Sequence, residues 1–158
     1  MQNELPVTGV VPVSQMLGES EEETALVRAM SERAQAFLSS FAWCESIEEF
    51  YFGDGIGNIF AAFFARIKPS RPSVDEYLWV VVGDVPPAYL VTDHCHTPKE
   101  AICAYIEEMR KRVAAARLGQ NPRDVIPVNA PATPESAEAL NRRLDTLEYE
   151  ILPKWFVD

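Results

Sequence analysis

Apolar residues in the first third of the chain recur at helical spacing, and a helix-capping pattern precedes them. Ser20 and Glu23 form a capping box, in which each side chain accepts a hydrogen bond from the other residue's backbone N–H. The pattern predicts an amphipathic helix over residues 20–42, and residues 1–18 before it are expected to be an extended lead-in to a single domain at 19–158. The apolar positions lie three or four residues apart: Leu26, Met30, Ala34, Phe37, Leu38 and Phe41.

The period then changes to short apolar runs separated by turn residues. We expect strands over residues 47–52, 59–67, 77–82 and 88–91. Residues 53–57 contain three glycines and are expected to form the first reversal, because glycine adopts the backbone angles of tight turns. Short connections between consecutive strands favour an antiparallel meander.

Two of these strands are apolar on both faces. In residues 59–67, Ala61 and Phe63 point to one face while Phe60, Ala62 and Phe64 point to the other. A sheet with one face in water should alternate apolar and polar residues. We therefore expect the second face to be covered by a helix, by the lead-in or by another subunit.

Two further helices follow the strands. Thr97 and Glu100 form a second capping box with Pro98 at the first helical position, and this helix is expected to reach Gly119. Thr133 followed by proline opens a last helix, which runs to residue 153. The predicted fold is α+β, an antiparallel meander of about four strands packed with three helices in the order α-β-β-β-β-α-α.

Charge narrows the range of partners. The 158 residues include 24 acids and 14 bases, a net charge of −10, and residues 1–67 alone hold ten acids and three bases, a net of −7. Nucleic-acid binding relies on a basic surface that releases counterions, so no nucleic-acid partner is expected. A basic protein partner would suit this charge.

The cysteines and the apolar runs indicate the compartment. Three cysteines at irregular spacing favour a reducing environment over a disulfide framework. The first 18 residues lack the basic region of a signal peptide, and no apolar run approaches the roughly 20 residues that span a bilayer. A cytoplasmic protein without membrane contact is expected.

One short segment contains metal-binding side chains. Asp93, His94, Cys95 and His96 are consecutive and include both histidines of the chain, and all three residue types bind zinc. The alternative is a polar loop before the helix capped by Thr97. No cofactor is expected, with zinc at this loop as the alternative. A Cys95–histidine nucleophile is disfavoured, because adjacent residues of an extended chain point to opposite sides.

Other polar clusters have structural explanations. Glycines 53–57 do not precede a helix, so they lack the helix N-terminus of a phosphate-binding loop. The basic run at residues 110–112 lies late in its helix, where the helix dipole favours cations. The aromatic residues point to an interface instead, since tyrosine and tryptophan often anchor protein partners. The candidates are Tyr51, Trp79, Tyr89 and Trp155.

Two stretches of the chain carry a resemblance. Residues 77–90 (YLWVVVGDVPPAYL), and residues 126–129 (IPVN) leading into residues 133–135 (TPE), resemble a group of small uncharacterised bacterial proteins, which brings no assigned activity. In size, acidity and element order the chain is also similar to the immunity proteins that neutralise bacterial toxins. The second resemblance implies a surface that covers a basic toxin.

The sequence thus predicts a function in binding rather than catalysis. The first hypothesis is a non-enzymatic protein-binding module, immunity-like in its acidic and aromatic surface. The alternative is a small metal-binding protein or metal-dependent enzyme centred on His94 and His96. A further alternative is a structural homodimer whose second copy covers the second sheet face.

Overall fold

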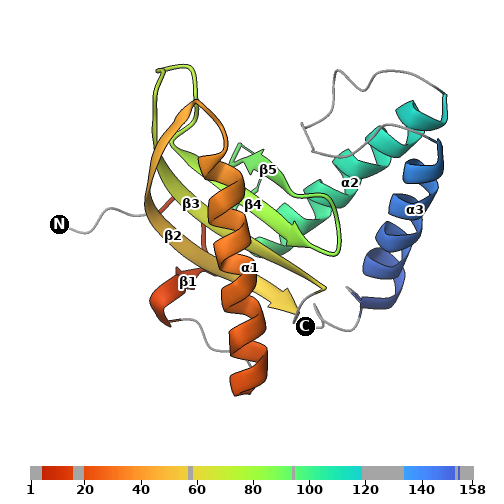
Figure 1. The fold of residues 1–158 in the computed structure, drawn as a ribbon, viewed down its shortest axis with the longest axis horizontal. Helices are drawn as coiled ribbons and strands as arrows, with labels where there is room; N and C mark the ends of the chain where they lie inside the picture. Colours follow the sequence, from red (N-terminus) through yellow and green to blue (C-terminus); the bar gives the residue numbers. More distant parts are fainter. Residues whose placement is uncertain are drawn as a thin grey trace.

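Five antiparallel strands form one sheet in the order β1-β2-β3-β4-β5, with helices on both of its faces (Figure 1). This arrangement was obtained as a computed structural model, which describes residues 5–15, 20–56, 59–93, 95–118, 134–151 and 153. It confirms the α+β class and the meander, with one strand more than the sequence predicts. The strands are β1 Val11–Pro12, β2 Cys44–Ile56, β3 Phe60–Pro69, β4 Tyr77–Gly83 and β5 Ala88–Val91.

The additional strand comes from the lead-in. β1 pairs with β2 at Val11–Phe52 and Pro12–Tyr51, and a short 3-10 turn at Val13–Gln15 follows it. Earlier in the lead-in, the Thr8 N–H donates a hydrogen bond to the His96 carbonyl at 2.8 Å. The described part of the lead-in is therefore docked on the domain.

β2 runs further than its pattern indicates. The turn expected at residues 53–57 is wrong, because Gly53 and Gly55 lie inside β2, which continues to Ile56. A Cβ on Gly55 would lie 2.8 Å from the Cβ of Ala61 on β3, so glycine is needed here for close approach of two strands. Three register shifts interrupt the β2–β3 pairing and bend the strand.

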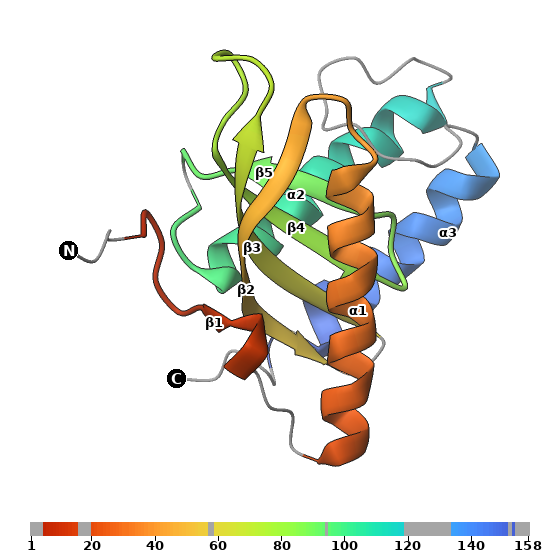
Figure 2. The same ribbon diagram turned by 60° about the vertical axis from the view of Figure 1, so that its left-hand side comes forward.

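The first helix covers one face of the sheet (Figure 2). α1, Glu21–Ser39, begins where the Ser20 hydroxyl accepts a hydrogen bond from the Glu23 N–H at 3.1 Å. Its apolar stripe, which includes Met30 and Leu38, packs against β3 and β4 residues such as Phe63. The predicted amphipathic helix is present, and it ends at Ser39 rather than near residue 42.

The other two helices cover the opposite face. α2, Pro98–Arg117, is capped by Thr97, and α3, Pro134–Asp145, continues into a π-helical segment η2, Thr146–Ile151. They bury the side of the sheet that carries Phe60, Phe64 and Trp79. The expectation that both faces are covered is confirmed, and the cover belongs to the same chain. The sheet itself therefore gives no reason for a homodimer.

None of the described helices is long and apolar enough to cross a membrane.

Gly83 allows the end of β4 to pass close to the start of β3, so Gly83→Ala should destabilise the fold. Its φ of +143° is one that other residues rarely adopt, and a Cβ there would lie 2.5 Å from the Cα of Phe60 and clash with the Ile59 carbonyl oxygen. We expect the free energy of unfolding to fall by at least about 2 kcal/mol, measured by urea denaturation. A variant as stable as the wild type would contradict the close approach.

Candidate functional site

Four aromatic side chains form a half-buried cluster where α1 ends. Phe37 lies in the last turns of α1, Phe41 and Trp43 lie in the connection to β2, and Tyr89 lies on β5. Antiparallel pairing brings the start of β2 to the same end of the sheet as the end of β5. We call these four residues the aromatic face.

The rings of the aromatic face contact one another directly. The Phe41 and Trp43 rings are stacked, with centroids 4.7 Å apart, and the Tyr89 ring meets both nearly edge-on at 5.3 and 5.1 Å. These are ordinary contact distances for aromatic pairs. A cation bound between two ring faces lies within about 6 Å of each centroid. The 4.7 Å between the stacked Phe41 and Trp43 centroids leaves no room for a cation between these rings. The cluster is therefore a packed surface rather than an open cage.

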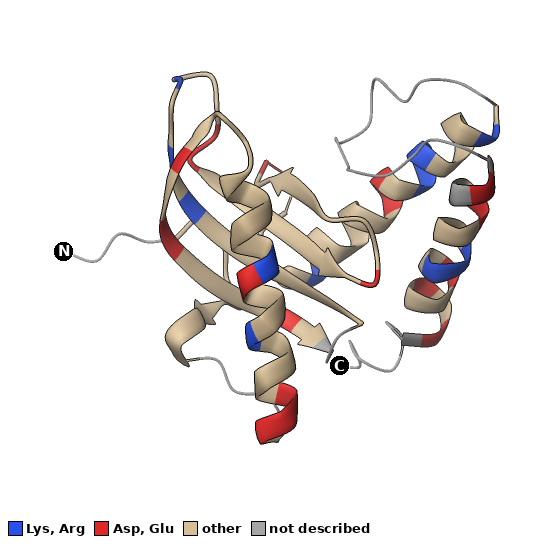
Figure 3. Cartoon of the chain, in the orientation of Figure 1, with Lys and Arg blue, Asp and Glu red and all other residues tan. Residues whose placement is uncertain are grey.

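Charge around the aromatic face is mixed, with an excess of acid (Figure 3). The register of the strands brings six acids and three bases to this end of the sheet. Two of the bases are paired, Arg66 with Glu49 at 3.2 Å and Lys68 with Glu45 at 3.6 Å. The acids are Glu45, Glu48, Glu49, Asp75, Glu76 and Asp93, and the bases are Arg66, Lys68 and Arg71.

Tyr51 lies outside the aromatic face. It is half-buried on β2 against Phe64, and its hydroxyl donates a hydrogen bond to Glu49 at 2.9 Å. Tyr51 and Arg66 therefore share one carboxylate. Their hydrogen bonds, that of Arg66 being the stronger influence, hold the pKa of Glu49 below its ordinary value.

The two tryptophans of the predicted interface have different outcomes. Trp79 is 0% exposed, and its indole N–H donates a hydrogen bond to the Cys95 carbonyl at 2.8 Å. The prediction that Trp79 binds a partner is wrong, because its polar atom is satisfied inside the core. Trp155 lies outside the described residues.

The Asp93–His96 loop separates its candidate ligands. Cys95 is only 5% exposed, and burial raises the pKa of its thiol. His96 is 59% exposed at its side chain, with Nδ1 3.9 Å from a Glu100 oxygen. Asp93 is exposed, and His94 lies outside the described residues. No three histidine, cysteine or acidic side chains within the described ranges could hold one metal ion. Zinc binding at this loop stays a prediction.

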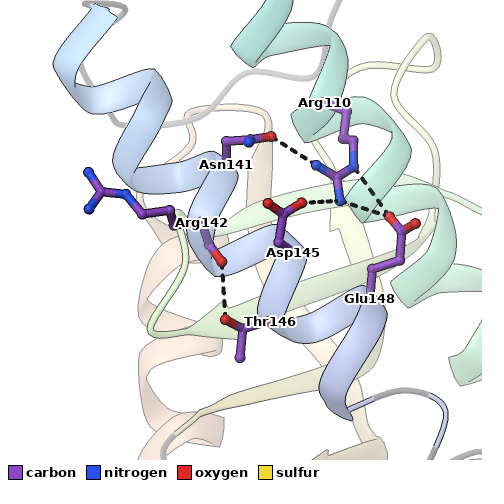
Figure 4. Close-up of polar contacts among 6 residues, drawn as sticks. All are labelled: Arg110, Asn141, Arg142, Asp145, Thr146 and Glu148. Atoms are coloured by element: carbon purple, nitrogen blue, oxygen red, sulfur yellow. Dashed lines mark hydrogen bonds and ion pairs between the residues drawn. The ribbon is translucent and has the colours of Figure 1, made fainter.

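The basic run on α2 provides a structural connection. Arg110 reaches across to α3 and η2 and donates hydrogen bonds to Asn141 at 2.8 Å, Asp145 at 3.0 Å and Glu148 at 3.0 and 3.2 Å (Figure 4). An open groove of about 800 Å³ runs beside it, between α2 and the exposed Tyr149. Because the guanidinium is already hydrogen-bonded to two carboxylates, Arg110 serves to connect α2 with α3 and η2.

The chain matches no protein-family model, no curated protein and no solved structure. The resemblances to bacterial and immunity proteins therefore stay predictions, and function has to be argued from geometry.

Arg66→Met should raise the pKa of Glu49 toward its ordinary value of 4.5. Because these contacts lower the pKa of Glu49 in the folded state, they stabilise the fold at pH values above about 4.5. This stabilisation is lost as the pH falls through the folded-state pKa and the carboxylate becomes protonated. Tyr51→Phe should raise the pKa less. An NMR titration of the carboxyl carbons would measure both changes.

Asp54, also on β2, is the internal control for that titration. Burial raises the pKa of Asp54, and no described arginine or lysine pairs with it, so it should titrate alike in all variants. An unchanged Glu49 titration in Arg66→Met would contradict the contacts.

Arg110→Ala should weaken the attachment of α3 to α2. Arg110 is 29% exposed and has three partner residues, so we expect a loss of about 2 kcal/mol in the free energy of unfolding. Arg117→Ala is the matched control, since Arg117 is more exposed and pairs only with Glu138 among the described residues; it should cost less than about 1 kcal/mol. Equal losses in urea denaturation would argue against a special role for Arg110.

Proposed function

We propose that the chain is a non-enzymatic protein-binding module that holds a basic protein against the aromatic face. The supporting observation is the half-buried contact cluster of Phe37, Phe41, Trp43 and Tyr89 at one end of the sheet. This protein buries Trp79 completely, whereas the four rings of the aromatic face keep part of their surface in water. Aromatic residues that stay partly in water are frequent anchors of protein interfaces.

The rigidity of the cluster favours a binding role. Phe37 and Phe41 are held by α1 and its last turn, where the Ser40 N–H donates hydrogen bonds to the Ala36 and Phe37 carbonyls. Tyr89 is held by its pairing with Val80 on β4. A surface whose side chains are already ordered loses little conformational entropy when a partner binds.

The surrounding charge supports a basic partner. Asp75, Glu76 and Asp93 are exposed at this end of the sheet, where acids outnumber bases and two of the three bases are already paired with Glu49 and Glu45. A basic protein would be attracted to this region over a distance of roughly 10 Å at moderate salt. In the immunity-like form of the proposal, the partner is a basic toxin.

Replacement of single rings should reduce partner binding without unfolding the chain. We expect Trp43→Ala or Tyr89→Ala to lower affinity by roughly 30-fold, as for a typical interface anchor. Tyr149→Ala is the matched control, because Tyr149 is an exposed aromatic residue distant in the fold from the aromatic face. The measurement is quantitative capture from native lysate, followed by titration of the purified partner with each variant.

Circular dichroism would confirm that each variant is folded. The captured protein should be basic, and its retention should weaken as salt is raised. Absence of any stoichiometric protein, or equal retention by the ring variants and the control, would refute the proposed function.

A further inference from the structure

We propose that the outer edge of β5 receives an extended, lysine- or arginine-rich segment of the partner, which adds to the sheet as a further strand. The inference rests on the proposed function, since it specifies how the basic partner is held. It follows from a difference between the two edges of the sheet.

The β2 edge is protected against strand addition. β1 already pairs with it over two residues, and three register shifts distort its course. Glu45, Glu48 and Glu49 add charge along the remaining stretch. Bulges and charged residues are the usual means by which proteins prevent pairing at an exposed edge.

The β5 edge carries none of these features. Its four residues, Ala88–Val91, are uncharged, and they pair with β4 at four consecutive positions without a register shift. Val91 is 40% exposed and Tyr89 is partly exposed, whereas Ala88 and Leu90 are buried, so the accessible part of this edge is its C-terminal end. In antiparallel pairing, alternate residues turn their N–H and C=O groups away from the neighbouring strand. Within the described ranges, no backbone hydrogen bond from another segment reaches residues 88–91 on that side.

The neighbouring side chains determine which segment fits. Leu78 pairs with Val91, so Asp75 and Glu76 before β4 lie at the same end of the sheet as Asp93 after β5. A segment paired with β5 would lie beside Asp93, and Asp75 and Glu76 lie one strand further in at the same end of the sheet. Tyr89, on the same strand, would place every second side chain of the segment beside the aromatic face.

The same charges disfavour a second copy of this chain as the occupant. Each copy carries a net charge of −10, and joining two β5 edges would bring two sets of these carboxylates together. Like charges across an interface are unfavourable, whereas a basic segment is complementary. The edge therefore favours a basic partner over a homodimer.

Hydrogen exchange with a model peptide tests the inference. The probe is a short peptide that alternates lysine and valine, added to the full chain at low salt, and the control peptide alternates glutamate and valine. The lysine peptide should slow exchange of the outward-facing amides of β5 by tenfold or more, about 1.4 kcal/mol, and the glutamate peptide should not.

Two matched variants locate the effect. Val91→Lys introduces a positive charge on β5 that repels the lysine peptide, and it should weaken peptide binding about tenfold or more. Val11→Lys makes the same change on β1, where the valine is 43% exposed, and it should bind like the wild type. Circular dichroism would establish that both are folded.

Several results would overturn the inference. These are no slowing of β5 exchange at millimolar peptide, equal binding of both peptides, or equal loss in the two lysine variants. Sedimentation that shows a dimer broken by Val91→Lys would assign the edge to a second copy instead. If Trp43→Ala abolishes partner capture while Val91→Lys does not, the edge inference fails alone. If β5 is protected by the peptide but no protein is captured, the proposed function fails alone.

Discussion

Phe63 and Phe64 are consecutive residues of β3, and both are buried completely on opposite faces of the sheet. Because apolar surface is stable only when it is removed from water, this strand requires a layer of structure on each side. α1 provides one layer, and α2 with α3 provides the other. The position of α1 then decides where its last turn meets the sheet, and that meeting point creates the aromatic face.

The apolar residues on both faces of β3 and β4 predict from the sequence that both faces are covered, but they leave open whether a helix, the lead-in or another subunit covers the second face. Capping boxes at Ser20 and Thr97 likewise predicted where two helices begin. The glycine cluster misled the interpretation of β2, because glycine serves two purposes. It permits tight turns, and it also permits close approach of strands, as Gly55 does beside Ala61. The local pattern does not distinguish these uses.

The candidate site was only partly accessible to sequence reasoning. The sequence predicts Tyr89 as an interface residue but places Phe37 and Phe41 in the helix stripe, where their spacing of four residues fits equally well. Their partial exposure depends on where the end of α1 meets the sheet and on their contacts with Tyr89 of β5, which are tertiary properties. Trp79 shows the opposite case, since a core carbonyl from Cys95 satisfies its N–H. Such a partner, sixteen residues away, leaves no local signal.

The unequal edges of the sheet also limit how these molecules can assemble. An open-ended filament of sheets needs two receptive edges on every subunit, so that each addition creates a new site for the next. Here the β2 edge is distorted, charged and partly closed by β1, so an addition at β5 leaves nothing for a third molecule to join. Two copies joined at their β5 edges would leave only these β2 edges, so edge pairing between copies of this chain stops at two molecules. A chain with an exposed edge can in this way remain free of fibrous aggregation even at high concentration.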